Sequence, residues 1–311
     1  MRKLAPFAVL GIMVLVLGIA KPRFLATGNL LNIGTQMAPV ALMAVGQMLV
    51  IISAGIDLSI GSVLALSGVV STLLMAEFQL PLWLSLCAGV LVGTLCGWLN
   101  GLMITLGRIP PFIATLGMMG VARGLALILS GGVQVSVSDP NFSYIGNGRF
   151  LDVVPLPVII TLLVAVAGHM LLQQTKMGRY TYAIGSNREA AWLSGVNVDQ
   201  TLRRIYTMSG ALAGLAGIIL MARLSSGQPA EGEGIELIVI AACVIGGASF
   251  SGGEGTVLGS VIGALIMGVL RNGCNLLQIP VFWQRVFIGA IIIIAVFADQ
   301  YRKHRQQGPS G

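Results

Sequence analysis

Four polar side chains stand inside long apolar stretches of this 311-residue chain, where they could contact a solute or bond neighbouring helices. They are Gln47, Asn100, Thr115 and Arg123. Polar groups are costly within a membrane, so they tend to mark functional positions or to pair with one another. Arg123 falls about midway through its stretch and should face a wet cavity or a polar partner, not lipid. Interhelical hydrogen bonding and a solute pathway both stay open for each residue.

A short capped helix is predicted inside residues 173–204, the longest polar interruption between apolar stretches. Ser186 and Glu189 have capping-box spacing, in which the hydroxyl accepts from the Glu189 N–H and the carboxylate reaches back to the Ser186 N–H. Gly195 suits the left-handed conformation that closes a helix. Because a helix of about two turns is marginal alone in water, it should pack against something.

Two acidic turns join apolar stretches. Asp57 suits a helix N-cap whose carboxylate accepts from the N–H groups of Ser59 and Ile60, at the positive end of the helix dipole. The alternative is a gate or coupling contact near the cytoplasmic surface. Glu254 stands in a similar glycine-rich turn. The similar sequences of the two turns indicate an internal repeat, although a glycine-rich composition alone can produce the same similarity.

No motif typical of an enzyme is present. The chain lacks a Gly-x-x-x-x-Gly-Lys-Ser/Thr phosphate loop and a His-Glu-x-x-His motif. Gly-Ala-Ser-Phe at 247–250 superficially matches an intramembrane protease motif, but the only histidines are His169 and His304, so a general base is missing. We expect no catalytic residue, no metal site and no cofactor in this chain.

Composition predicts a membrane protein. Hydrophobic residues make up 56% of the chain and charged residues 9%, against about 25% charged in an average soluble domain. The net charge of +7 comes from Lys and Arg in short loops, with no basic face interleaved with aromatic residues, so we expect no nucleic-acid partner. The four cysteines lie in apolar stretches without metal-ligand spacing and are interpreted as small buried hydrophobic residues.

Ten apolar stretches approach the roughly 20 residues that a spanning helix needs. They cover 4–20, 36–54, 60–77, 81–104, 110–130, 154–172, 205–223, 235–249, 256–276 and 281–299. The sequence therefore predicts an all-α membrane protein, a polytopic bundle of about ten transmembrane helices in one domain, 1–311. Glycines four residues apart, at 89, 93, 97 and 101 and again at 255, 259 and 263, predict close helix packing, or a sliding surface in a moving bundle.

The distribution of positive charge predicts the orientation. Most of the 18 Lys and Arg residues lie in loops on the side of 173–204, which favours that loop and both termini in the cytoplasm. The longest loop on the other side is 133–153. No loop is long enough for a soluble catalytic domain, so any energy-converting domain belongs to another chain.

Several short motifs occur in a fixed order along nearly the whole chain. They are Gly-Ile-Asp-Leu-Ser-Ile-Gly at 55–61, Asn-Gly at 100–101, Pro-Pro-Phe-Ile at 110–113, Thr-Leu-Gly at 115–117, Arg-Gly at 123–124, Gly-Ser-Asn at 185–187, Glu-Ala-Ala at 189–191 with Gly195, and Gly-Gly at 246–247 and 252–253. Each is weak alone. The ordered set resembles the permease subunit of ribose-type (monosaccharide) ABC importers, the inner-membrane component of binding-protein-dependent transport.

The resemblance implies a type II ABC importer permease fold with two permease subunits per pore, either a homodimer or two related chains. It also implies cytoplasmic ATPase subunits that bind ATP and Mg, and a periplasmic or extracellular sugar-binding protein. The chain would be a multi-pass protein of the bacterial inner membrane, and ATP hydrolysis would occur on the separate ATPase chain. Trp192 stands where a more polar residue is expected, and Ala54 replaces a glycine.

The resemblance also assigns roles to residues. Ser186, Glu189, Ala190, Ala191 and Gly195 would form the coupling helix that docks on the ATPase. Transport would proceed by alternating access, and a neutral polyol needs hydrogen-bond donors and acceptors and an aromatic face. Two further sets of residues complete the expectation. The path candidates are Gln47, Asn100, Phe112, Thr115 and Arg123, and those for a gate or cytoplasmic turn are Asp57, Ser59 and Glu254.

Three alternatives remain. A related importer for branched-chain amino acids or nucleosides is the nearest, since the binding protein usually sets specificity. An ion-coupled secondary transporter would need buried acids, whereas Asp57 and Glu254 are predicted at turns. A membrane scaffold without transport would show no solute flux.

Overall fold

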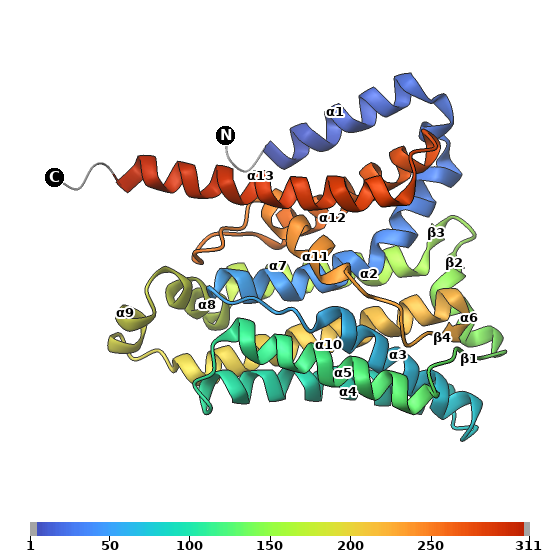
Figure 1. The fold of residues 1–311 in the computed structure, drawn as a ribbon, viewed down its shortest axis with the longest axis horizontal. Coiled ribbons are helices and arrows are strands. Elements are labelled where there is room, and N and C mark those ends of the chain that lie inside the picture. Colours follow the sequence, from blue (N-terminus) through green and yellow to red (C-terminus); the bar gives the residue numbers. More distant parts are fainter. Residues whose placement is uncertain (1–4, 308–311) are drawn as a thin grey trace.

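Helices make up most of residues 5–307, the part of the chain that this computed structural model describes. They run along one common direction to form an elongated bundle (Figure 1). The helices are α1 (Ala5–Ala20), the 3-10 turn η2 (Pro22–Leu25), α2 (Thr27–Ile52), α3 (Ile60–Ala76), α4 (Leu82–Thr105), α5 (Pro111–Ser130), α6 (Pro140–Asn147), α7 (Leu156–Gln174), α8 (Lys176–Ser186), α9 (Arg188–Leu193), α10 (Val198–Leu224), α11 (Ile235–Ile245), α12 (Val257–Leu276) and α13 (Val281–Gln307).

The predicted all-α membrane fold is confirmed, and each of the ten apolar stretches coincides with one helix. Six helices of the described residues are long and apolar enough to cross a membrane, namely α2, α4, α5, α7, α10 and α12. Four shorter apolar helices are α1, α3, α11 and the first part of α13. The number of ten crossings stays a prediction, because length and composition alone do not establish it.

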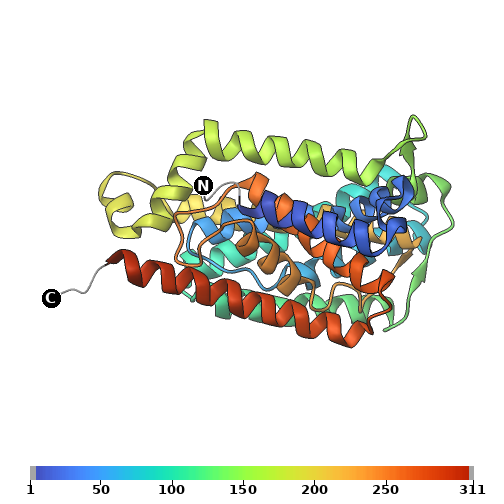
Figure 2. The same ribbon diagram turned by 90° about the horizontal axis from the view of Figure 1, so that it is seen from above.

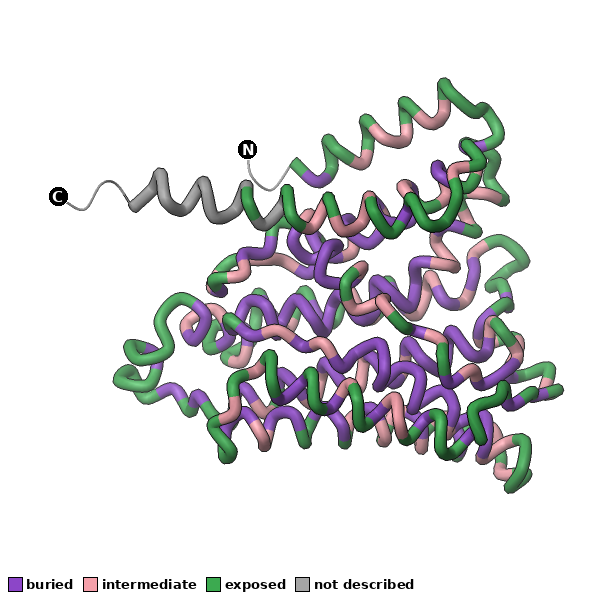
Figure 3. Tube along the Cα trace, viewed as in Figure 1, coloured by how far each residue is buried: buried purple, intermediate pink, exposed green. Residues whose placement is uncertain are grey.

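α2 and α10 are among the most buried helices of the bundle. The most apolar window of α2 is 89% buried and that of α10 is 72% buried, whereas that of α7 is only 22% buried. Figure 3 shows the buried residues concentrated around the middle helices and the exposed ones on the outer helices. Seen from above, α7 and α13 lie on opposite flanks of the bundle (Figure 2). The exposed apolar side chains of the outer helices are those expected to face lipid.

Glycine brings two pairs of helices into backbone contact. A Cβ atom at Gly93 or Gly97 of α4 would collide with the backbone of Gly210 or Tyr206 in α10. In α12, Gly259 and Gly263 meet the end of α11 in the same way. The predicted close packing is confirmed, because only a residue without a side chain allows this approach. The sliding surface stays a prediction.

The two ends of the bundle differ. α8 and α9 project from one end, which we call the α9 end, and short β-strands with α6 form the other, the β1 end (Figure 1). Four strands make two antiparallel pairs: β1 (Val135–Ser136) with β4 (Ser226–Gly227), and β2 (Arg149–Phe150) with β3 (Val154–Pro155). α6 was not predicted within loop 133–153. Its N-cap is Asp139, whose side chain accepts from the Asn141 N–H at 2.7 Å.

Some of the chain inside the bundle is not helical. α2 ends at Ile52 and α3 begins at Ile60, and the unwound segment 53–59 runs back into the bundle, so that α3 starts well inside it (Figure 1). Ala54 in this segment adopts a left-handed conformation with φ of 61°. Similar unwound stretches precede and follow α11. Non-helical backbone at membrane depth must be paired with protein groups or water, because lipid offers no hydrogen bonds.

Candidate coupling helix and buried polar network

α9 is a short helix with a defined start, but Ser186 does not cap it. Asn187 is the N-cap, and its side-chain oxygen accepts from the Ala190 N–H at 2.9 Å. The predicted capping box of Ser186 and Glu189 is therefore wrong. The reason is that α8, which was not predicted, continues through Ser186 and leaves the next residue to begin α9.

The end of α9 agrees with the prediction. Gly195 has a φ of +83°. Its N–H donates to the Trp192 carbonyl at 2.9 Å, and the Val196 N–H donates to the Ala191 carbonyl at 3.0 Å. These two bonds form a Schellman motif, which satisfies the last carbonyls of the helix. α9 is thus closed at both ends.

The side chains of α9 divide into a buried and an exposed face. Ala191 is 5% exposed, whereas Trp192 and Leu193 are 66% and 72% exposed. Glu189 and Ala190 are also exposed. Large apolar side chains at a polar end of the protein indicate a surface for a partner.

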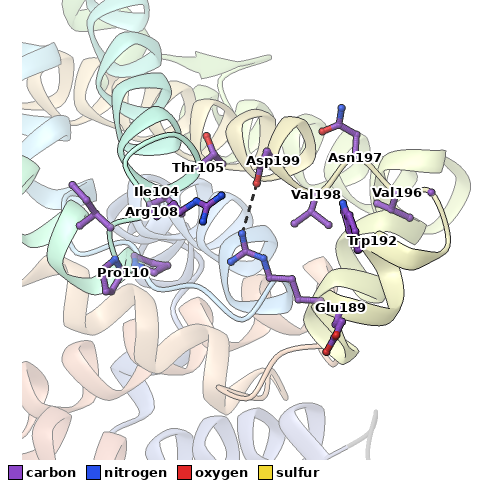
Figure 4. A pocket seen from close by; sticks show the side chains of 14 residues that line it. Ile104, Thr105, Arg108, Pro110, Glu189, Trp192, Val196, Asn197, Val198 and Asp199 are labelled. Carbon is purple, nitrogen blue, oxygen red and sulfur yellow. Dashed lines mark ion pairs between the residues drawn. The ribbon is translucent and has the colours of Figure 1, made fainter.

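A cleft of about 900 Å³ lies beside α9. It is bounded by α9, the start of α10 and the turn between α4 and α5 (Figure 4). Arg108 and Pro110 come from that turn, and Glu189 and Trp192 come from α9. The lining thus mixes charged and apolar groups contributed by separate helices.

α8 contacts the interior through backbone atoms. A Cβ at Gly185 would collide with the Ile52 carbonyl oxygen at the end of α2, and the same oxygen accepts from the Gly253 N–H at 2.9 Å. The Tyr182 hydroxyl donates to the Gly255 carbonyl at 2.8 Å. Burial raises the pKa of that hydroxyl, which keeps it protonated as a donor. The ends of α2 and α8 and the stretch that contains the exposed Glu254 therefore meet in one junction.

Asp57 lies in the protein interior and is 1% exposed. Its Oδ1 accepts from the Ser59 N–H at 2.9 Å and from the Ser59 hydroxyl at 2.6 Å, and its Oδ2 accepts from the Ser209 hydroxyl at 3.2 Å. Ser59, not Asp57, is the N-cap of α3, so the predicted bond to the Ile60 N–H is wrong. The expectation of a surface turn is wrong as well, because segment 53–59 folds back into the bundle.

Three of the path candidates converge on the same segment. With its amide oriented to pair donor with acceptor, Gln47 accepts from the Asp57 N–H at 3.2 Å and donates to the Asp57 carbonyl at 3.3 Å. Asn100 Nδ2 donates to Ser59 Oγ at 2.9 Å. The Thr115 hydroxyl lies 3.3 Å from the Ile56 carbonyl and 2.8 Å from its own helix carbonyl at Pro111. Gln47, Asn100 and Thr115 are all 0% exposed, so they hold segment 53–59 and contact no solvent.

Two residues of α10 complete this network and were not predicted. Ser209 bonds Asp57, and the Tyr206 ring is fully buried beside Gly55, where a Cβ would collide with its hydroxyl. Within the described residues, the Tyr206 hydroxyl and Asn100 Oδ1 have no hydrogen-bond partner. Both α10 residues interrupt an apolar stretch, which was the available signal in the sequence.

The other two path candidates lie apart from the network. Phe112 is 52% exposed near the start of α5. Arg123, near the middle of α5, donates to the carbonyls of Pro229 and Glu231 in the stretch before α11, the latter at 2.8 Å. Arg123 therefore has polar partners. Among the described residues, no three His, Cys, Asp or Glu side chains lie together as metal ligands would.

Comparison with known proteins assigns the family. A family model described as the permease component of branched-chain amino acid transport systems matches residues 29–296. The chain belongs to this permease family. It is a multi-pass membrane protein and a transport subunit, not an enzyme. The resemblance inferred from the ordered motifs is confirmed.

Individual relatives cover nearly the whole chain. The ribose import permease protein RbsC of Bacillus subtilis is 44% identical over 96% of this chain and 93% of the relative. RbsC of Escherichia coli K12 is 40% identical over 94% and 92%, and the D-allose transport system permease protein AlsC of the same strain is 39% identical over 96% and 91%. No solved structure matches. Because Asp57 is buried, its position no longer argues against an ion-coupled secondary transporter. Membership of the permease family is the argument against that alternative.

Proposed function

We propose that this chain is the permease subunit of an ATP-driven, binding-protein-dependent importer of a monosaccharide, working by alternating access. The observation that carries the proposal is the set of relatives about 40% identical over nearly the whole chain and named for ribose and allose transport. A further relative, the L-arabinose permease protein AraH of Azospirillum brasilense, is 38% identical. The substrate class is a pentose or hexose.

In this proposal α9 is the coupling helix. Its two capped ends give a rigid shape, and the exposed Trp192 and Leu193 offer an apolar contact to an ATPase subunit. The cleft between α9 and the α4–α5 turn accepts a projecting element of that partner. ATP and Mg are bound by the ATPase, so this chain needs no cofactor of its own.

The remaining partners follow from the same scheme. A second permease subunit, identical or related, completes the pore, and a sugar-binding protein delivers substrate at the β1 end. The protein lies in the bacterial inner membrane with the α9 end and both termini in the cytoplasm. The concentration of Lys and Arg near α9 supports this orientation.

The path candidates take two roles. Phe112 and Arg123 lie on α5, whose Gly117, Gly120 and Gly124 border open space, and we assign this helix to the path. Gln47, Asn100 and Thr115 act indirectly, because they hold segment 53–59. Asp57, Ser59 and Glu254 belong to the unwound stretches that form the gate.

An importer for branched-chain amino acids is the second candidate, because the matching family model carries that description. The test is uptake by proteoliposomes that contain the native complex with its ATPase and binding protein. Ribose, allose and arabinose are compared with leucine and isoleucine. ATP-dependent sugar uptake supports the proposal, whereas uptake of amino acids alone, or uptake without ATP, contradicts it.

The docking of α9 has its own test. Glu189→Lys reverses an exposed charge in the first turn of α9. We expect ATP-driven uptake to fall about ten-fold or more while the subunit still inserts, since a like-charge contact across an interface costs at least about 1.4 kcal/mol. Glu189→Gln, which removes the charge without reversing it, is the matched control. Normal uptake by Glu189→Lys would remove α9 from the ATPase contact.

A further inference from the structure

We propose that Asp57 is a positioning residue of the transport cycle, which links the unwound segment 53–59 to α10 and transmits the motion of α9 to the start of α3. This inference rests on the proposed function, because it describes how a docked coupling helix acts on the membrane interior. Asp57 does not touch the solute in this proposal. It acts through the two helices that its carboxylate joins.

The first step is the connection between α9 and α10. The Schellman motif ends α9 at Gly195, and the Asn197 side chain caps α10 by accepting from the Gln200 N–H at 3.0 Å. Arg188 of α9 and Asp199 of α10 form an ion pair at 3.7 Å, seen in Figure 4. The two helices are thus separated by a short turn of defined geometry. α10 then continues without a break to Leu224, so a displacement of α9 moves the whole helix.

The second step is the connection between α10 and segment 53–59. Ser209 donates to Asp57 Oδ2 at 3.2 Å. One turn earlier on α10, the Tyr206 hydroxyl lies against Gly55. α10 therefore contacts the segment at two adjacent positions, one by a hydrogen bond and one by packing. The steric contact resists only an approach of α10 to the segment, whereas the hydrogen bond between Ser209 and Asp57 also resists their separation.

The third step is the connection between Asp57 and α3. Asp57 Oδ1 accepts two hydrogen bonds from Ser59, the N-cap of α3. Asn100 of α4 also donates to the Ser59 hydroxyl. A movement of Asp57 relative to α4 therefore changes the hydrogen bonds of Ser59 and shifts the first turn of α3. At its other end the segment is anchored, because the Ile52 carbonyl is bonded to Gly253.

The network also has unused bonding capacity. The donors that reach the Asp57 carboxylate in the described structure are neutral groups of Ser59 and Ser209. Among the residues that the structure describes, the Tyr206 hydroxyl and Asn100 Oδ1 are buried and have no hydrogen-bond partner. A buried polar group without a partner raises the free energy of the arrangement that contains it, so a second arrangement that pairs these atoms lies closer to it in free energy. A link made of neutral donors can exchange partners between the two states of the cycle.

The experiment measures sugar molecules transported per ATP hydrolysed, in proteoliposomes that contain the complete importer. Ser209→Ala removes only the link between α10 and Asp57. We expect this ratio to fall about five-fold or more, the factor for about 1 kcal/mol of one buried hydrogen bond. Ser260→Ala is the matched control, since Ser260 is also fully buried, and its hydroxyl donates to the Val257 carbonyl of its own helix.

Two further variants separate positioning from folding. Asp57→Asn keeps an oxygen for Ser59 and an amide that can donate to Ser209, so it should retain most of the wild-type ratio. Asp57→Ala should lower the ratio at least as far as Ser209→Ala. If Asp57→Ala fails to assemble, Ser209→Ala and Asp57→Asn still give the result.

The outcomes are distinct. A ratio that falls in Ser209→Ala but not in Ser260→Ala, with ATP hydrolysis maintained, supports the positioning role. An unchanged ratio overturns it, and so does a parallel loss of uptake and hydrolysis, which a merely structural residue would give. If the wild-type complex couples ATP hydrolysis to sugar uptake, either of these two results for Ser209→Ala overturns this inference and leaves the proposed function intact. Absence of ATP-driven uptake in the wild type overturns the proposed function and the inference together.

Discussion

Gly93 in α4 occupies a position where no side chain fits. Its backbone lies against that of Gly210 and Gly214 in α10, and any Cβ atom there would overlap main-chain atoms that cannot move aside. Gly120 in α5, by contrast, has open space on the corresponding side. The same residue type is therefore required at one position and replaceable at the other.

Gly93→Ala should destabilise the folded protein by about 1–3 kcal/mol, because the added methyl group forces two helices apart. Gly120→Ala should be neutral or stabilising by up to about 1 kcal/mol, since alanine has the higher helix propensity. Thermal unfolding of the two variants in detergent, compared with the wild type, measures the difference. A melting temperature for Gly93→Ala equal to that of Gly120→Ala would contradict the packing described for α4 and α10.

Asn187→Ala removes the cap of α9 and should destabilise that helix by about 1 kcal/mol. Ser186→Ala should leave α9 unchanged, since the Ser186 hydroxyl makes no cap bond. Amide hydrogen exchange of residues 189–194 in the purified complex reports the local opening of α9. Faster exchange in Ser186→Ala than in Asn187→Ala would show that Ser186, and not Asn187, caps α9.

At the scale of elements, the long apolar stretches predicted the helices well. The structure of the polar segments between them was predicted poorly. A membrane-length apolar run has few alternatives to a helix, because lipid leaves backbone groups no other partners. The sequence predicts Asp57 as a helix N-cap at a turn, or as a gate or coupling contact near the cytoplasmic surface, because it lies between two apolar stretches. Its burial depends on Ser209, which lies 152 positions away in sequence, and on Gln47 and Asn100 from two other helices. No local pattern contains that information.

α8 and the start of α9 were missed for a related reason. α8 carries polar residues on much of its surface and resembles a loop by composition. Its helical form depends on contacts of Gly185 and Tyr182 with α2 and the stretch before α12. The family-level motifs still located α9 correctly, because Gly195 and the Glu-Ala-Ala sequence do not depend on where α8 ends.

The whole molecule has two chemically different ends, and its orientation can be tested directly. In a Cys87→Ser background, which removes an exposed native thiol, Trp192→Cys places a thiol on α9 and Leu151→Cys places one between β2 and β3. Both native side chains are well exposed, at 66% and 78%. We expect a membrane-impermeant maleimide to label Leu151→Cys in intact spheroplasts, and Trp192→Cys only after permeabilisation. The opposite pattern would place α9 outside and contradict ATPase docking.

Segment 53–59 behaves differently from a helix of the same length. Bending a helix disturbs a ladder of successive bonds, whereas here Gln47, Asn100, Thr115 and Ser209 each hold one point of the segment separately. Each attachment can loosen on its own, so the stiffness of this joint is set by residues on four helices. Natural variation at those distant positions would therefore adjust how easily the joint flexes, while the sequence of the joint itself stays the same.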